Sequence, residues 1–168
     1  MRCKHFTNCR CIEDVKEQYH KLTKMYHPDL NRDMDTTEIM KEINAEFTEL
    51  HKQFKNIHRS TKEAGATYES TQATQETPEE FIEILNKIIH LDGIDIEICG
   101  KWIWISGNTK HYKDILKQAG CRWASKKLMW YWHAKGEECK HRGNVPIEKI
   151  RERYGSTTIN TEKLYALA

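Results

Sequence analysis

Three consecutive residues, His27-Pro28-Asp29, combine side chains suited to contact with another protein. Pro28 fixes one backbone dihedral and lacks an N–H donor, so it stiffens the chain at this point. Asp29 is a short acceptor that suits an arginine on a partner. A tripeptide alone is a weak signal, because a proline between two polar residues also simply turns the chain between two helices. Its meaning therefore depends on the elements on either side.

Both neighbours of the tripeptide have helical periodicity. Before it, apolar residues recur at spacings of three and four on one side of a predicted helix from Ile12 to the proline, which ends it. After it, Asp35-Thr36-Thr37 offers cap residues for a second helix, in which Met40, Ile43, Phe47, Leu50 and Phe54 form an apolar seam. Two such helices pack as a hairpin and bury both seams.

A basic stripe accompanies the first helix. Lys16, His20 and Lys24 repeat every four residues, and Lys21 extends them. We expect these side chains to lie on the outer surface, where lysines would approach an acidic patch and raise the rate of association. The alternative is an ordinary solvated face, which is the usual role of charged stripes.

This arrangement resembles the J-domain family, the DnaJ-type co-chaperones. The blocks that match in character run from Tyr19-His20-Lys21-Leu22 to Tyr26-His27-Pro28-Asp29, with Lys41-Glu42-Ile43-Asn44 in the second helix. The resemblance covers about residues 6–56. It implies that His27, Pro28 and Asp29, together with Lys16, His20, Lys21 and Lys24, bind a DnaK-type chaperone ATPase and stimulate its ATP hydrolysis.

The chain also departs from the family pattern. The usual first helix is not recognisable, and we expect Phe6–Cys11 to be a shortened substitute. No glycine- and phenylalanine-rich segment or repeated CxxCxGxG ribbon follows. The protein in this respect resembles the short J-domain proteins of phages and mobile elements of Gram-positive bacteria.

The remaining chain predicts a second, α+β domain. Residues 59–77 are polar and are expected to form a flexible linker after a J-domain-like part at 1–58. Residues 78–135 alternate between helical and two-residue periodicity, in the order helix, strand, strand, helix, strand, strand. We predict two β-hairpins with helices on one face, followed by a polar tail at 136–168 with one short helix.

All five tryptophans of the chain lie in this second domain. Between residues 101 and 135 it also contains eight basic residues and a single acidic one, Asp114. Trp102 and Trp104 share one face of a strand, and Trp130 and Trp132 share a face of another. We expect at least half of these four rings to be buried in the core of the domain. The alternative is a nucleic-acid interface on which bases stack. It would consist of Trp102, Trp104, Trp130, Trp132, Lys113, Lys117, Arg122, Lys126 and Lys127.

Composition excludes several classes of protein. The chain has 168 residues, 38% of them hydrophobic and 31% charged, and no apolar run approaches the ~20 residues that span a bilayer. The N-terminal residues do not resemble a secretory signal, so we expect a cytoplasmic protein. Cys3, His5, Cys9 and Cys11 cluster without a usual zinc spacing, and we expect no metal or other cofactor. No convergent acid, base and nucleophile is found, and we expect no enzymatic activity.

Overall fold

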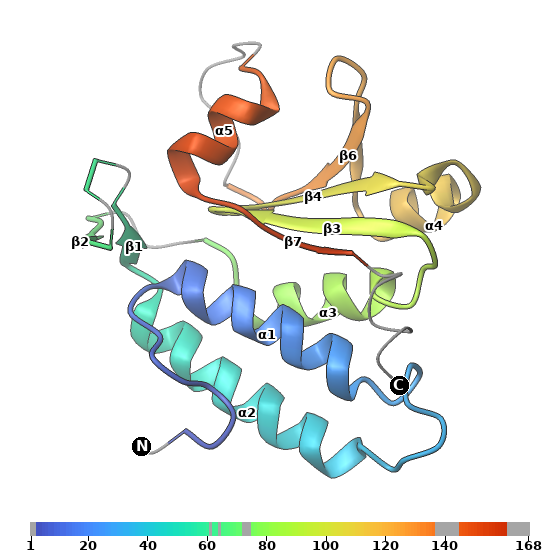
Figure 1. The fold of residues 1–168 in the computed structure, drawn as a ribbon, viewed down its shortest axis with the longest axis horizontal. Helices are drawn as coiled ribbons and strands as arrows, with labels where there is room; N and C mark the ends of the chain where they lie inside the picture. The colour runs from blue at the N-terminus through green and yellow to red at the C-terminus, as the bar shows by residue number, and fades with distance from the viewer. Residues whose placement is uncertain (1–2, 61, 64, 72–74, 137–144, 161–168) are drawn as a thin grey trace. The chain divides into compact units, whose positions relative to one another are not determined.

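The structure is a computed structural model, and it describes residues 3–60, 62–63, 65–71, 75–136 and 145–160 (Figure 1). The chain divides into two compact units, residues 1–82 and 83–168. Each unit has its own secondary structure and its own core. We call them the N-terminal unit and the C-terminal unit.

The N-terminal unit is built on two helices that run in opposite directions, α1 (Ile12–Tyr26) and α2 (Thr37–Phe54). Their apolar seams meet as predicted: Val15, Tyr19, Ile43 and Phe47 are fully buried. The rings of Tyr19 and Phe47 lie 4.1 Å apart between centroids. Aromatic pairs of this kind add about 0.5–1.5 kcal/mol to the stabilisation that comes from burial. The predicted helical hairpin is confirmed.

Two segments outside the hairpin complete this core. Phe81, near the start of α3 (Pro78–Ile88), stacks on Phe47 at 5.5 Å between centroids. Phe6 is also buried, in a segment that is held to α2 by hydrogen bonds from the amides of Lys4 and His5 to the Glu46 carboxylate. Residues 6–11 are not helical until α1 begins. The core beside the hairpin is thus completed by a non-helical segment that carries Phe6 and by Phe81 of α3.

Part of the predicted linker is ordered structure, which corrects the expectation for residues 59–77. Strands β1 (Ile57–Arg59) and β2 (Thr67–Glu69) pair antiparallel. His58 of β1 is buried and its Nδ1 lies 2.8 Å from the carboxylate of Glu13 on α1. Three-residue strands with little apolar character leave almost no periodic signal, so composition alone indicated a flexible segment.

α3 begins with a reciprocal cap that the sequence pattern contains. The Thr77 amide donates to the Glu80 carboxylate, and the Glu80 amide donates to the Thr77 hydroxyl, each at 3.2 Å. This capping box satisfies two backbone donors that the first helical turn leaves without partners. The helix crosses the division between the two units, which lies between Ile82 and Glu83.

The C-terminal unit contains an antiparallel sheet in the order β5-β6-β4-β3-β7. Strands β3 (Ile94–Cys99) and β4 (Trp102–Gly107) form the first predicted hairpin, with Gly100 at φ 58° in its turn. Strands β5 (Arg122–Ala124) and β6 (Met129–Trp132) form the second. A short 3₁₀ turn, η1 (Thr109–Tyr112), and helix α4 (Lys113–Gln118) connect the two hairpins.

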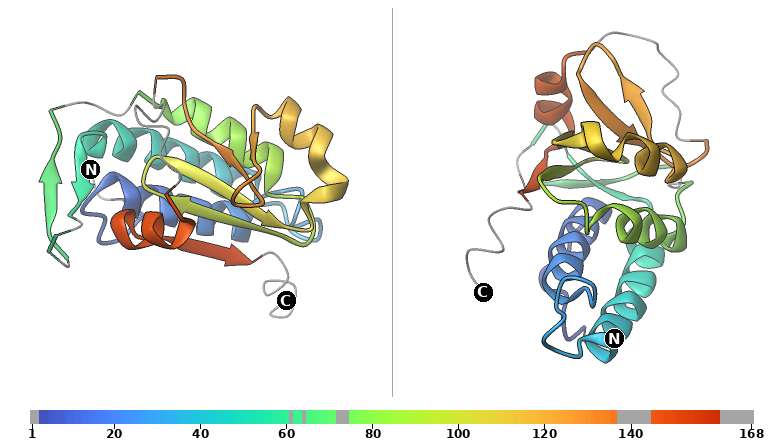
Figure 2. Two further views of the ribbon diagram at one scale, coloured as in Figure 1. Left: turned by 90° about the horizontal axis from the view of Figure 1, so that it is seen from above. Right: turned by 90° about the vertical axis from the view of Figure 1, so that its right-hand side faces the viewer.

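The predicted tail contributes to this sheet. Helix α5 (Ile147–Tyr154) confirms the expected short helix, and strand β7 (Thr157–Asn160) pairs with the outer edge of β3 (Figure 2). Arg151 of α5 makes a two-point ion pair with Glu97 of β3, at 2.7 and 2.8 Å. Residues 145–160 therefore belong to the folded unit, whereas residues 137–144 and 161–168 of that tail lie outside the described residues.

The α+β fold class is confirmed, with a helical hairpin followed by a unit that combines helices and a sheet. Within the described residues, no helix has both the length and the apolar character needed to cross a membrane.

Candidate functional site

The predicted partner-binding tripeptide lies where α1 ends. The His27 amide still donates to the Thr23 carbonyl at 2.8 Å, so it makes the last hydrogen bond of the helix. The backbone of His27 then becomes extended, as the residue before a proline prefers. Pro28 and Asp29 follow as a turn that is exposed to solvent, and the Asp29 side chain is 70% accessible.

Several hydrogen bonds to the His27 carbonyl stabilise the turn. The His27 carbonyl accepts from the amides of Leu30 and Asn31, at 3.0 and 3.1 Å. The Asn31 side-chain amide donates to the carbonyls of both His27 and Met25, at 3.0 and 2.9 Å. Asn31 thus ties the loop to the last turn of α1. The sequence analysis missed this residue, although an asparagine shortly after a turn is a common source of such local bonds.

His27 differs from its two neighbours because its ring is largely buried. Its Nδ1 accepts a hydrogen bond from the Asp29 amide at 3.2 Å and lies 3.8 Å from the Asp29 carboxylate. In the neutral ring, an accepting Nδ1 leaves the proton on Nε2. The ring therefore positions Asp29, whose carboxylate is presented to solvent.

The prediction of an outward basic stripe on α1 is wrong for three of its four residues. Lys16, His20 and Lys24 are buried, and Lys21 alone is exposed. The reason for Lys16 is a carboxylate sixty residues further along the chain: its ammonium lies 2.8 Å from Glu76, and both side chains are at most 2% accessible. The ammonium also lies 5.0 Å from the centroid of the Phe81 ring.

His20 is a neutral imidazole in this environment. Burial, followed by the charges of Lys24 and Lys21, lowers the pKa of His20 to about 3. Neither ring nitrogen has a hydrogen-bond partner within the described structure. A group that holds no charge at neutral pH cannot steer an acidic partner, so His20 has a structural role.

Cys9 and Cys11 are thiols rather than thiolates. Burial raises the pKa of Cys9 to about 11 and that of Cys11 to about 12. Metal ligation requires the thiolate, which such a high pKa disfavours. Among the residues that the structure describes, no three His, Cys, Asp or Glu side chains are placed to share a metal ion.

The tryptophans of the C-terminal unit do not form the single platform that the alternative required. Trp104 is opposite Tyr131 in the sheet, whereas Trp130 is opposite Ile105. Since residues directly opposite one another share a face, Trp102 and Trp104 lie on one side of the sheet and Trp130 and Trp132 on the other. Trp104 and Trp130 are core, as expected for half of the four, and Trp102 and Trp132 are half-buried.

The basic residues of this unit differ in their exposure to solvent. Lys127 is half-buried, with its ammonium 5.6 Å from the Trp104 ring centroid. Lys113, Lys117, Arg122 and Lys126 are exposed, which the alternative of a nucleic-acid interface requires. Trp123, which the predicted interface omitted, is the most exposed tryptophan at 45%.

Comparison with known proteins finds a local similarity to DnaJ. A stretch of 38 residues, 23% of the chain, is 45% identical to the chaperone protein DnaJ of Geobacillus sp. (strain WCH70). The DnaJ proteins of Parageobacillus thermoglucosidasius and Geobacillus stearothermophilus match to the same extent. The match spans about a tenth of the length of these relatives, which carry the names of chaperones. No protein-family model matches the chain, and no solved structure matches it.

This similarity points to a J-domain in the chain, in agreement with the resemblance found in its residues. The resemblance to phage and mobile-element proteins stays a prediction.

Proposed function

We propose that this protein is a J-domain co-chaperone, whose His27-Pro28-Asp29 loop binds a DnaK-type ATPase and stimulates ATP hydrolysis there. The observation that carries the proposal is the exposed turn at Pro28 and Asp29 between the two helices of a hairpin, and the local similarity to DnaJ supports it.

The loop has the chemistry of a preorganised contact. Proline and the Asn31 hydrogen bonds restrict the backbone before binding, which lowers the entropy lost on association. The Asp29 carboxylate is free to accept a two-point hydrogen bond from an arginine of the partner. Lys21 adds one exposed positive charge on α1 close to the loop.

Stimulation requires more than binding. The loop must bind the hydrolysis-competent state of the ATPase more tightly than the resting state, because a ligand shifts an equilibrium only through its differential affinity. Under this proposal the protein itself carries out no chemistry and works in the cytoplasm, where its ATPase partner is. The C-terminal unit would direct the ATPase to a target.

The test is a single-turnover ATPase assay with DnaK of Geobacillus stearothermophilus, one of the organisms whose DnaJ matches this chain. We expect the full chain to accelerate hydrolysis, and Asp29→Asn and His27→Gln to abolish at least about nine-tenths of that stimulation, as loss of a charged hydrogen bond of about 1.5–3 kcal/mol implies.

The matched control is Asp33→Asn, which removes one negative charge from an exposed position of the same loop. It should stimulate like the unchanged protein. Equal stimulation by the Asp29→Asn and Asp33→Asn proteins would refute the proposed contact. Circular dichroism of each variant separates loss of the contact from loss of the fold.

A further inference from the structure

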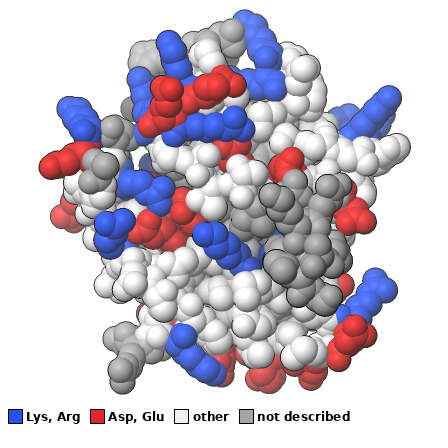
Figure 3. All heavy atoms as spheres, in the orientation of Figure 1, with Lys and Arg blue, Asp and Glu red and all other residues white. Residues whose placement is uncertain are grey.

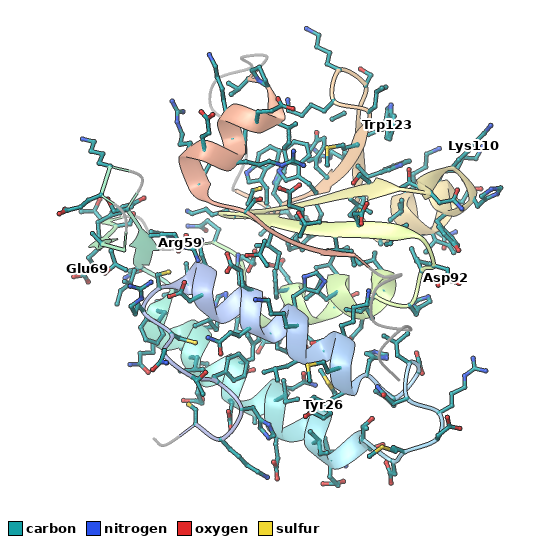
Figure 4. All side chains as sticks on the ribbon, viewed as in Figure 1. Tyr26, Arg59, Glu69, Asp92, Lys110 and Trp123 are labelled. Atoms are coloured by element: carbon teal, nitrogen blue, oxygen red, sulfur yellow. The ribbon has the colours of Figure 1, made fainter. Side chains whose placement is uncertain are left out.

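One edge of the C-terminal sheet presents an indole ring to solvent. Trp123 lies on β5, the strand at the end of the sheet order, so it has a neighbouring strand on one side only. Its ring contacts that of Trp130, at 5.5 Å between centroids and an angle of 60°, and 45% of the residue is accessible. Figure 4 shows the Trp123 side chain projecting from the hairpin, with Lys110 on the same side of the unit.

Exposed lysines lie on the elements that precede and follow this strand in the chain. Lys110, Lys113 and Lys117 follow one another at spacings of three and four along η1 and α4, which places them on one side of that segment, about 5–6 Å apart between Cβ atoms. Lys126 lies at the tip of the β5–β6 hairpin. All four are exposed.

These lysines differ from the other lysines on helix surfaces of this protein. Lys41 and Lys52 each pair with a glutamate three residues away, and Lys87 pairs with Glu83. Within the described part of the chain, Lys110, Lys113, Lys117 and Lys126 form no ion pair with any carboxylate. In Figure 3 the blue side chains at the upper right, over η1 and α4, stand apart from red ones, whereas red and blue are mixed over α5.

Register places the ring and the lysine-bearing helix on the same side of the sheet. Trp123 is opposite Trp130, and Trp132 follows on the same face of β6. A Cβ on Gly120, just after α4, would lie 3.8 Å from the Trp132 indole, so the end of α4 packs against that face. Three residues then connect Gln118 to Arg122 and β5. The indole and the helix that carries Lys113 and Lys117 thus lie on the same face of the sheet.

We propose that this surface, consisting of Trp123, Lys110, Lys113, Lys117 and Lys126, binds single-stranded nucleic acid. An exposed ring provides a platform on which an unpaired base stacks, and unpaired ammonium groups at helical spacing contact successive phosphates. The charge complementarity is that of a polyanion, since Asp114 is the one acid between residues 101 and 135. A duplex is a poorer ligand because its base faces are already stacked.

The experiment measures fluorescence anisotropy of a labelled oligothymidylate of about 20 nucleotides, titrated with the full-length protein over a range of salt concentrations. We expect binding at low salt that weakens as salt rises, since bound phosphates release counterions. Trp123→Ala should weaken binding about tenfold, with Trp123→Phe between the two. Lys113→Gln with Lys117→Gln should reduce the slope of log affinity against log salt by about 1–2.

Two exposed residues on α5 give matched controls. Tyr154→Ala removes an exposed aromatic ring, and Lys149→Gln removes an exposed lysine, and both should bind the oligonucleotide like the unchanged protein. No salt-dependent binding by the unchanged protein would overturn the proposal. Equal affinity of Trp123→Ala, or equal affinity for duplex DNA or heparin, would overturn the stacking contact.

This inference is independent of the co-chaperone function. Trp123→Ala should keep its stimulation of DnaK, and Asp29→Asn should keep its affinity for the oligonucleotide. Failure of one proposal therefore leaves the other to be judged on its own assay.

Discussion

Basic side chains at similar helical spacings are buried in the N-terminal unit and exposed in the C-terminal unit. On α1, basic residues at every fourth position are buried, and Lys16 is neutralised by Glu76. On η1 and α4, lysines at the same kind of spacing are exposed and have no ionic partner within the described structure. For Lys16, the difference comes from a carboxylate far away in the chain rather than from the local pattern. A periodic charge pattern thus specifies a helix face, while the surrounding fold decides whether that face reaches a partner.

The strongest test of this difference is Glu76→Gln. It leaves the Lys16 ammonium buried beside Phe81 without a counter-charge, which for buried pairs costs about 3–5 kcal/mol. Urea unfolding should show that loss of stability. The double variant Lys16→Met with Glu76→Leu should recover most of it, because neither charge is then buried alone. A loss below about 1 kcal/mol for Glu76→Gln would contradict the role given to this pair.

The corresponding pair in the C-terminal unit is Arg151 with Glu97, and we expect a smaller effect there because the Arg151 side chain is 42% accessible. Burial by itself would raise the pKa of Glu97, but hydrogen bonds from Arg151 and Ser156 hold it below its usual range. Arg151→Gln should cost about 1–3 kcal/mol at neutral pH. Because the folded-state pKa is depressed, this stabilisation should be present above the ordinary glutamate pKa and fade as pH falls below it. Unfolding at several pH values compares the variant with the unchanged protein.

Protonation of His20 in the N-terminal unit should also make the stability of the fold depend on pH. Its pKa is about 3 in the folded protein and near 6.5 in the unfolded chain. Between these values only the unfolded chain takes up the proton, so stability should fall by at most ~1.4 kcal/mol for each pH unit of acidification. His20→Leu should remove this contribution, giving a shallower loss of stability from neutral pH to about pH 5. Identical pH dependence in both proteins would show that His20 becomes protonated in the folded state.

We expect the smallest change in the free energy of unfolding for a substitution of an exposed lysine on α4. Lys113→Gln alters a side chain that makes no ion pair within the described residues, so the free energy of unfolding should change by less than about 0.5 kcal/mol. The same unfolding assay used for Glu76→Gln measures it. A large loss here would mean that the lysines of α4 stabilise the fold.

Much of the local structure could be predicted from the sequence, because helices such as α1 and hairpins such as β3–β4 carry their periodicity in neighbouring residues. The short strands β1, β2 and β7 could not, since Thr157–Asn160 has no clear alternation and gains its place through pairing with β3. The same limit applies to the candidate sites. The exposed loop at Pro28 was predictable from local residues.

Three other features of those sites depended on contacts that only the folded chain reveals. The burial of Lys16 depends on its contact with Glu76, which is distant in the sequence. The hydrogen bond that holds the His27-Pro28-Asp29 loop depends on the side-chain conformation of Asn31. The division of the tryptophans between two faces depended on the register of β4 against β6, where a shift of one residue would reverse every side chain.

The position of Phe81 has a practical consequence for anyone who dissects this protein. A fragment cut after residue 58, where composition changes, would lack both the ring that covers Tyr19 and Phe47 and the carboxylate that neutralises Lys16. Such a fragment should be partly unfolded and should fail in the ATPase assay for reasons unrelated to its loop. The smallest piece that retains the aromatic cluster must extend into α3, a helix whose last residues belong to the second unit.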